Sequence, residues 1–211
     1  MGEKAAAAKT HWDGVYRSKP ADTVSWYRPH LETSLALLAR AGLGPDSRVI
    51  DVGGGASTLV DDLLARGVQA ITVLDLSQQA LDLARARLGE GGDRVNWLAA
   101  DLLSADLPAA GFDLWHDRAV LHFLTAPEQA AAYAAQAARA VRAGGHAVIG
   151  GFAPDGPERC SGLPVARRSA DDIAALMGPA FEQVEQHRET HLTPAGREQA
   201  FAWAVLRRTR C

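Results

Sequence analysis

The chain has 211 residues, 47% of them hydrophobic, and a formal net charge of −3. This size supports one core, and no linker divides it, so we expect a single domain over residues 1–211. The charge argues against a nucleic-acid surface, which needs clustered Lys and Arg. Two cysteines exclude a disulfide framework and a multi-cysteine metal site. Because no apolar run reaches membrane-spanning length, we expect a cytoplasmic protein without a membrane partner.

Strands and helices are expected to alternate along the chain, starting with a short β-branched strand at 49–52, three glycines and a helix at 57–66. Ser77 should cap a second helix that ends at Gly89, and Thr125 with Glu128 should form a capping box around Pro127. Further strands are expected at 70–75, 94–98, 112–117 and 146–152, with an alanine-rich helix between the last two. Two final strands lie within 181–192 and 200–208.

Strands separated by helices predict an α/β fold in which a mostly parallel sheet is covered by helices on both faces. The last two strands leave no room for a helix between them. One of them should therefore run antiparallel, which gives a seven-stranded sheet with one antiparallel strand.

Three acids follow strands whose carboxyl ends share one edge of such a sheet. Asp51, Asp75 and Asp101 are therefore expected to border the crevice where ligands bind in open α/β sheets. A dinucleotide would explain Asp75 as a ribose ligand. The fingerprint for a dinucleotide needs a glycine or alanine at its sixth position, however, where this chain has Thr58, and Asp51 would repel a pyrophosphate.

The combination resembles the class I S-adenosylmethionine-dependent methyltransferases. Their first motif corresponds to the stretch from Asp51 to Gly55, and acids after their second and third strands correspond to Asp75 in LDLS and Asp101 in AADLL. The resemblance implies a Rossmann-like, doubly wound sheet and S-adenosylmethionine as the cofactor. It assigns to cofactor binding the residues Asp51, Gly53, Gly54, Gly55, Asp75 (ribose), Asp101 (adenine), Leu76 and Leu102. The purely structural alternative is a tight turn flanked by helix caps.

A second resemblance lies in HWDGVYRSKPADTVSWYRP, which starts at His11. It is similar to the Trp-Asp lead segment of thiol, thiopurine and tellurite-resistance methyltransferases and of some protein-lysine methyltransferases. The resemblance implies that residues 1–40 form a helical lid, with Trp12 and Trp26 at the cofactor and Tyr16 and Tyr27 at the acceptor. The alternative is an amphipathic helix packed on the sheet.

The candidates for catalysis are His116, Asp117 and His122, just past the fourth strand. His122 could act as a base with a pKa near neutral, or could simply satisfy a hydrogen bond in the core. Asp117 could instead form an ion pair with Arg118. The loop at 153–168 is too long for a simple crossover and should lie on the substrate side, with Arg159 and Cys160 as substrate-binding candidates.

These features favour metal-independent methyl transfer to a small-molecule acceptor, because no magnesium-binding pattern or nucleic-acid methyltransferase signature is evident. A protein-lysine methyltransferase acting on an acidic protein surface is the alternative. A catalytically silent S-adenosylmethionine-binding protein is the third possibility.

Overall fold

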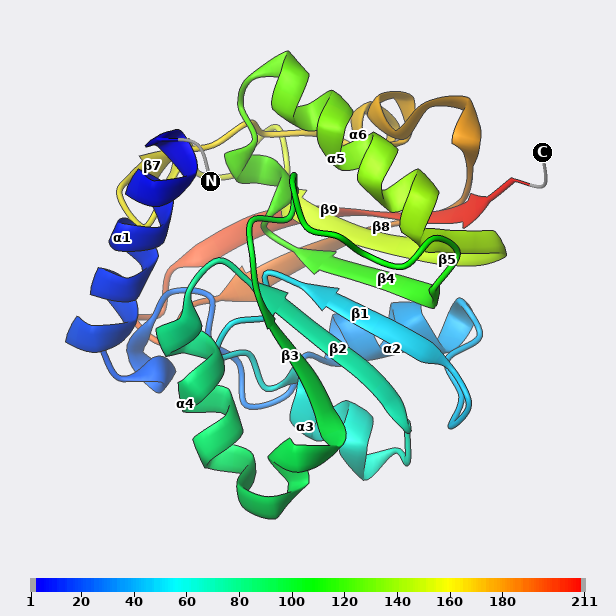
Figure 1. Ribbon diagram of the computed structural model, residues 1–211. Helices are drawn as coiled ribbons and strands as arrows, with labels where there is room; N and C mark the ends of the chain where they lie inside the picture. Colours follow the sequence, from blue (N-terminus) through cyan, green and yellow to red (C-terminus); the bar gives the residue numbers. More distant parts are fainter. Residues whose placement is uncertain (1–2, 210–211) are drawn as a thin grey trace.

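A seven-stranded sheet organises the protein, whose computed structural model describes residues 3–209 (Figure 1). Its strand order is β3-β2-β1-β4-β5-β9-β8. The first five of these run parallel, and β9 is antiparallel to both of its neighbours. The predicted Rossmann-like sheet with one antiparallel strand is confirmed. The strands are β1 (Arg48–Val52), β2 (Ala70–Asp75), β3 (Val95–Ala99), β4 (Phe112–Arg118), β5 (Val141–Phe152), β8 (Phe181–Leu192) and β9 (Glu198–Arg208).

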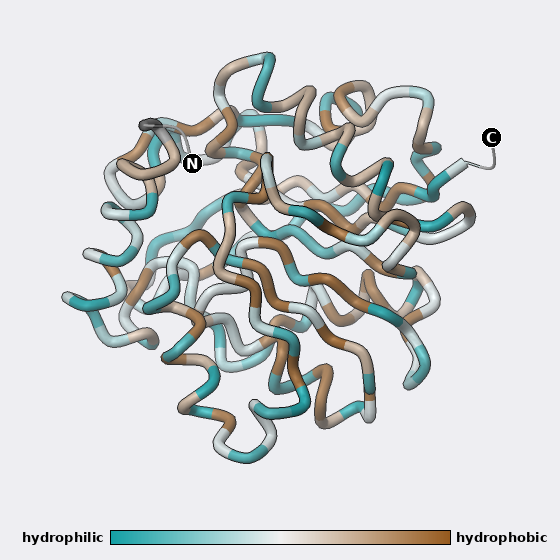
Figure 2. Tube along the Cα trace, viewed as in Figure 1, coloured by the Kyte–Doolittle hydropathy of each residue, from teal (hydrophilic) through white to brown (hydrophobic). Residues whose placement is uncertain are grey.

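Helices cover both faces of the sheet because neighbouring residues of each strand point to opposite sides. In β1, Val49 packs into the core that lies under α2 (Glu32–Arg40) and α3 (Leu59–Ala65). Ile50 packs into the core under α5 (Pro127–Ala140) and α6 (Ala170–Met177). The central strands are correspondingly the most hydrophobic part of the trace in Figure 2.

The N-terminal helix α1 (Glu3–Ser18) lies beyond the carboxyl ends of the strands and contacts α4 (Gln78–Leu88) (Figure 1). Ser77 caps α4 by accepting a hydrogen bond from the Ala80 N–H at 3.2 Å, as predicted. No helix within residues 3–209 is long and apolar enough to cross a membrane.

The start of α5 differs from its prediction. Ala126 is the N-cap and makes no side-chain cap bond, so the expected capping box of Thr125 and Glu128 is absent. The helix ends at Ala140, and the next residue, Val141, already pairs with Phe112 in the sheet. A capping box occurs instead at Ser169 and Asp172, at the start of α6.

The segment at 153–168 is ordered by a small hairpin of β6 (Arg159–Cys160) and β7 (Leu163–Pro164). Backbone bonds anchor its far end: the Ala166 N–H donates to the His122 carbonyl and the Arg168 N–H to the Phe152 carbonyl. The hairpin thus lies beside α1 at the same edge of the sheet (Figure 1).

We expect Gly150→Ala to destabilise the fold. A Cβ at Gly150 would lie 2.5 Å from the ring of Trp203, which is fully buried and has no room to move. Overpacking of this kind costs about 1–3 kcal/mol of unfolding free energy, which chemical denaturation can measure. Gly14→Ala is the control, because a Cβ there meets nothing within 4 Å and the site is an exposed helical position. An equal loss of stability in both variants would contradict the packing argument.

Candidate functional site

A cavity of about 490 Å³ opens at the carboxyl ends of β1, β2 and β4, with α1 and the β6–β7 hairpin contributing walls. The predicted site residues that line it are Gly53, Asp75, Leu76, Asp101, Leu102, Trp12, Tyr16, Trp26 and Cys160. A smaller cavity of about 50 Å³ shares Gly53, Tyr16 and Trp26, and is also lined by Asp51, Gly54, His116 and Tyr27. Four predicted residues line neither cavity: Gly55, Asp117, His122 and Arg159.

Asp75 brings a buried carboxylate to the wall of the larger cavity. Its Oδ1 accepts a hydrogen bond from the Ser77 N–H at 2.8 Å. Burial, together with the nearby carboxylates of Asp51 and Asp13, raises the pKa of Asp75 to about 7. Hydroxyl donors supplied by a ligand would stabilise the ionised form of this carboxylate.

Asp101 lies one strand further along the same edge. Its Oδ1 accepts from the Leu103 N–H at 3.1 Å, and the side chain remains partly accessible. Leu76 and Leu102 also line the cavity, so an apolar surface accompanies each acid. This pairing of a polar acceptor with an apolar wall suits a flat heterocycle that carries a donor group.

The glycine loop brings the backbone close to other parts of the chain. Gly53 has φ of 64°, a region that favours glycine, and a Cβ there would lie 1.9 Å from Cγ2 of Val120. At Gly55, with φ of 46°, a Cβ would lie 2.9 Å from the Tyr16 hydroxyl and 3.0 Å from Oδ2 of Asp75. Larger residues would therefore displace the loop or the cavity wall.

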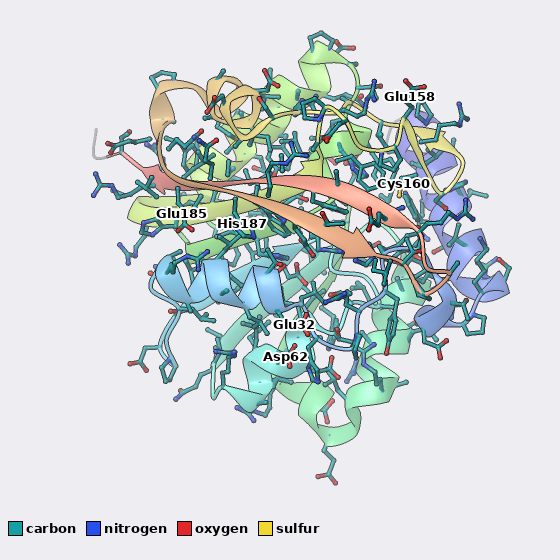
Figure 3. The ribbon with its side chains drawn as sticks, turned by 180° about the vertical axis from the view of Figure 1, so that it is seen from behind. Glu32, Asp62, Glu158, Cys160, Glu185 and His187 are labelled. Atoms are coloured by element: carbon teal, nitrogen blue, oxygen red, sulfur yellow. The ribbon has the colours of Figure 1, made fainter. Side chains whose placement is uncertain are left out.

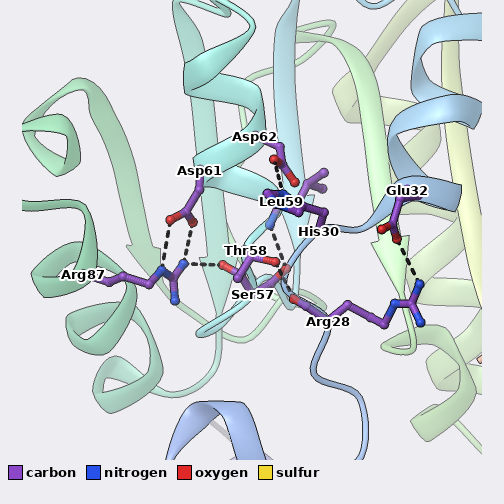
Figure 4. Close-up of polar contacts among 9 residues, drawn as sticks. All are labelled: Arg28, His30, Glu32, Ser57, Thr58, Leu59, Asp61, Asp62 and Arg87. Atoms are coloured by element: carbon purple, nitrogen blue, oxygen red, sulfur yellow. Dashed lines mark hydrogen bonds and ion pairs between the residues drawn. The ribbon is translucent and has the colours of Figure 1, made fainter. Parts of the chain in front are cut away.

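Polar contacts fix the segment after the glycine loop from both sides (Figure 4). The Thr58 hydroxyl donates to the Arg28 carbonyl at 2.8 Å, which ties the loop to the N-terminal segment. On the other side, Arg87 pairs with Asp61 and donates to the Ser57 carbonyl. The loop is thus held independently of any ligand.

Asp51 and His116 form a buried pair. Nδ1 of His116 lies 2.7 Å from Oδ1 of Asp51, and Nε2 lies 2.9 Å from the Ser34 hydroxyl on α2. Both ring nitrogens are therefore engaged by the protein. These two contacts link β4 to β1 and to α2 and fix the orientation of the His116 ring. No nitrogen of His116 is left to face the larger cavity.

Asp117 organises the turn after β4. Its carboxylate accepts from the N–H groups of Val120 and Leu121 and, at 2.6 Å, from the Tyr133 hydroxyl. Burial raises its pKa to about 6. The predicted ion pair with Arg118 is absent, because adjacent residues of a strand point to opposite faces. Asp117 positions Val120, which lines the larger cavity.

His122 is 2% exposed and packs between Phe123 and Phe152, with ring centroids 4.3 and 4.8 Å away. Burial and the charges of Arg168 and Arg118 lower its pKa to about 3. The expectation of a pKa near neutral is therefore wrong. His122 is uncharged at physiological pH and is too weak a base to take a proton efficiently.

Cys160 faces the larger cavity, and burial raises its pKa to about 11. Its thiol thus stays protonated near neutral pH. Figure 3 shows Glu158 and Cys160 on the segment that carries β6, close to α1. Arg159 is exposed and donates to the Gly162 carbonyl within the hairpin, away from the cavity lining.

Comparison with known proteins shows that the chain is similar to methyltransferases. Residues 49–145, which include the glycine loop, Asp75 and Asp101, match the family model described as a methyltransferase domain. This match covers somewhat less than half of the chain, and the curated proteins and solved structures that the chain resembles include further methyltransferases. Among solved structures, the fold is similar to that of a Burkholderia thailandensis didemethyltoxoflavin N-methyltransferase, with a TM-score of 0.71, 22% identity and coverage of 100% of this chain and 92% of that one.

Two curated methyltransferases show how varied the relatives are. The eEF1A lysine and N-terminal methyltransferase of Mus musculus is 24% identical over 56% of this chain. The ubiquinone biosynthesis O-methyltransferase of Aromatoleum aromaticum is 33% identical, also over 56% of this chain. The match covers 17% of the first relative and 52% of the second, so neither corresponds to this chain over its whole length.

The N-terminal helix α1 is tied to the end of β2, beside the larger cavity. Asp13 on α1 accepts a hydrogen bond from the Ser77 hydroxyl at 2.6 Å, and Ser77 also donates its N–H to Asp75. Trp12 packs edge-on against Trp26, with centroids 5.8 Å apart. These contacts join α1, the N-terminal aromatics and the end of β2.

Sequence reasoning missed several residues of this site, among them Asp13, Arg118 and Phe201. Asp13 stands in the quoted Trp-Asp motif, which was the signal available for it. Arg118 lines both cavities, and Phe201 lines the larger one from β9. The pattern carried no signal for Phe201, since it reads as one more apolar residue of a buried strand.

We expect Asp13→Ala to loosen α1, because the Ser77 hydroxyl loses its acceptor. Hydrogen exchange at the backbone amides of residues 3–18 should rise by about tenfold, while the sheet keeps its protection. Lys9→Ala is the control: Lys9 pairs with the other carboxylate oxygen of Asp13 and does not touch Ser77. Equal exchange in both variants would show that the bond to Ser77 does not hold the helix.

Proposed function

We propose that this chain transfers a methyl group from S-adenosylmethionine to a small-molecule acceptor, without a metal ion. The observation that carries the proposal is the 490 Å³ cavity, which joins the acids of the strand ends to an aromatic-lined space. Its size lies within the range of about 300–1,000 Å³ that is usual for small-molecule sites.

The cofactor half of the proposal rests on the strand ends. Asp75 would take the ribose hydroxyls and Asp101 the adenine amino group, with Leu76 and Leu102 against the ring. The backbone at Gly53 and Gly54 borders the smaller cavity, where the methionine part would lie. Asp51 would act there indirectly, since its carboxylate is paired with His116.

The part of the proposal that concerns the acceptor is supported by two features. The cavity has aromatic walls, and the predicted catalytic residues include no suitable base. Bound S-adenosylmethionine supplies an electrophilic methyl carbon on a sulfonium centre, which leaves as the neutral thioether when the acceptor's lone pair bonds to the methyl. None of His116, Asp117 and His122 lines the larger cavity. The protein's contribution is then to position the acceptor and exclude water, so we propose that Tyr16, Trp26 and Cys160 contact it.

The lid and loop assignments belong to the same proposal. Residues 1–40 would close the cofactor side through α1, and residues 153–168 would close the acceptor side through the β6–β7 hairpin. Both segments contribute side chains to the larger cavity, which supports these roles.

A protein-lysine methyltransferase is the second candidate, favoured by the Trp-Asp segment and by the lysine-methylating relative. A radiolabel experiment separates the two. Tritiated S-adenosylmethionine is incubated with the enzyme and either the filtered small metabolites or the protein fraction of a lysate. We expect label in the metabolite fraction. Transfer to protein alone would favour the lysine methyltransferase, and binding without any transfer would favour a silent S-adenosylmethionine-binding protein.

Asp75→Asn should weaken S-adenosylhomocysteine binding by about tenfold to a hundredfold, since a charged acceptor of two hydroxyls becomes a neutral amide. Calorimetry measures the affinity. The variant should fold and be at least as stable at pH 8, because the buried carboxylate that burial disfavours is gone. Asp82→Asn, at an exposed position of α4, is the control. Unchanged affinity in folded Asp75→Asn protein would contradict the ribose assignment.

Cofactor affinity should also depend on pH. The pKa of Asp75 is raised to about 7, so its carboxylate form, the better acceptor, dominates above that pH and is lost below it. Lowering the pH from about 8 to about 6 should therefore weaken S-adenosylhomocysteine binding by up to about tenfold. The dependence should be much smaller in Asp75→Asn. An identical pH profile in the variant would assign the titration to another group.

A further inference from the structure

Arg118 holds a positive charge at the border of the two cavities, and no residue within 3–209 forms an ion pair with it. It lies at the end of β4 and lines both spaces. Its Nη1 donates to the Trp26 carbonyl at 3.0 Å, whereas its Nη2 is buried and has no hydrogen-bond partner among residues 3–209. A buried guanidinium nitrogen without an acceptor destabilises the folded protein. An acceptor supplied by a bound ligand would offset that cost.

The surroundings of Arg118 favour an anion. Arg28 lies near enough to disfavour its charge, and Glu189, which favours it, lies beyond ion-pair distance and accepts from the indole N–H of Trp203. Desolvation lowers the pKa of Arg118, although an arginine remains charged at neutral pH. A carboxylate entering the cavity would supply the missing counter-charge.

The position of Arg118 points to the acceptor. Its guanidinium carbon lies 4.8 Å from the ring centroid of Phe201, and Cys160 is close enough for the two groups to affect each other's pKa. Phe201 and Cys160 line the larger cavity only, on the side of β5 and β9 that is remote from Asp75.

The carboxylate of the cofactor's methionine part is the other source of the same chemistry. That end of the cofactor is proposed to lie at the smaller cavity, beside Gly53 and Gly54. Arg28 also lines this smaller cavity and is absent from the lining of the larger one. Nη2 of Arg28 pairs with Glu32 at 3.0 Å, but that carboxylate is exposed, so a cofactor carboxylate could replace it. Arg28 is therefore a second cation on the proposed cofactor side, which leaves Arg118 for the acceptor.

We propose that Arg118 binds a carboxylate of the methyl acceptor, and that the acceptor is an aromatic or similarly apolar acid. The apolar body would contact Phe123, Phe152 and Phe201, which line the same cavity. Arginine suits this role because its planar guanidinium can pair with a carboxylate through two parallel hydrogen bonds. This inference rests on the proposed function and adds the class of the acceptor to it.

The first test uses wild-type protein saturated with S-adenosylhomocysteine. Benzoate, salicylate, phenylacetate and cinnamate are titrated, each beside its neutral amide, with calorimetry or tryptophan fluorescence as the readout. At least one acid should bind about tenfold or more tightly than its amide, because only the acid can pair with the guanidinium. If no acid in the panel binds better than its amide, the proposal is overturned.

The second test assigns the preference to Arg118. Arg118→Gln should abolish the difference between acid and amide, and Arg118→Lys should retain part of it. Arg207→Gln should leave it unchanged, because Arg207 is a half-exposed residue paired with Glu182 outside the cavity lining. Preserved acid preference in Arg118→Gln would overturn the proposal. If that variant does not fold by circular dichroism, the wild-type comparison and Arg118→Lys decide.

The third test separates the acceptor from the cofactor. Binding of S-adenosylhomocysteine, which has the carboxylate, is compared with binding of methylthioadenosine, which lacks it. Arg118→Gln should change both affinities by less than about threefold. A selective loss of S-adenosylhomocysteine binding would assign the carboxylate to the cofactor and overturn the acceptor assignment. Failure of wild-type protein to bind S-adenosylhomocysteine would instead count against the proposed function.

Discussion

Asp51 and Asp75 are buried at neighbouring strand ends, where a carboxylate costs free energy unless it has a partner. The two carboxylates differ in their partners. Asp51 is paired with His116, whose second nitrogen meets Ser34, so this acid is satisfied within the core. Asp75 has a backbone donor, but its burial and, to a smaller extent, two nearby acids keep its pKa high. The first arrangement stabilises the junction of β1 and β4, and the second leaves an acceptor ready for a ligand.

The N-terminal helix follows from the same constraint. Asp13 reaches the end of β2 because Ser77 offers a hydroxyl there, and this bond places Tyr16 against the glycine loop. A third acid is thereby added near Asp75, which raises its pKa further. The position of α1 beside the cavity and part of the raised pKa of Asp75 are therefore consequences of one packing arrangement.

With the proposed function, catalysis would depend on the position of the acceptor more than on proton transfer. His122 is uncharged and enclosed by aromatic rings, and Asp117 is occupied with the turn that carries Val120. Neither can activate an acceptor directly. Arg118, by contrast, has a charge that the described protein does not neutralise by an ion pair, and it stands where an acceptor would enter. The curated relatives are named as a lysine and N-terminal methyltransferase and as an O-methyltransferase, so we expect the walls of the cavity, rather than the shared sheet, to determine the acceptor.

The sequence by itself determined the sheet, its mostly parallel direction and the edge at which Asp51, Asp75 and Asp101 lie. Hydrophobic periodicity and turn residues are local signals, and the carboxyl ends of parallel strands necessarily share an edge. Ser77 as a helix cap followed from the same local chemistry. Only the tertiary structure decided what His116 and His122 do, because their partners come from segments distant in the chain. His116 meets Asp51 across 65 positions, and His122 loses basicity through burial and through two arginines that no spacing rule places beside it.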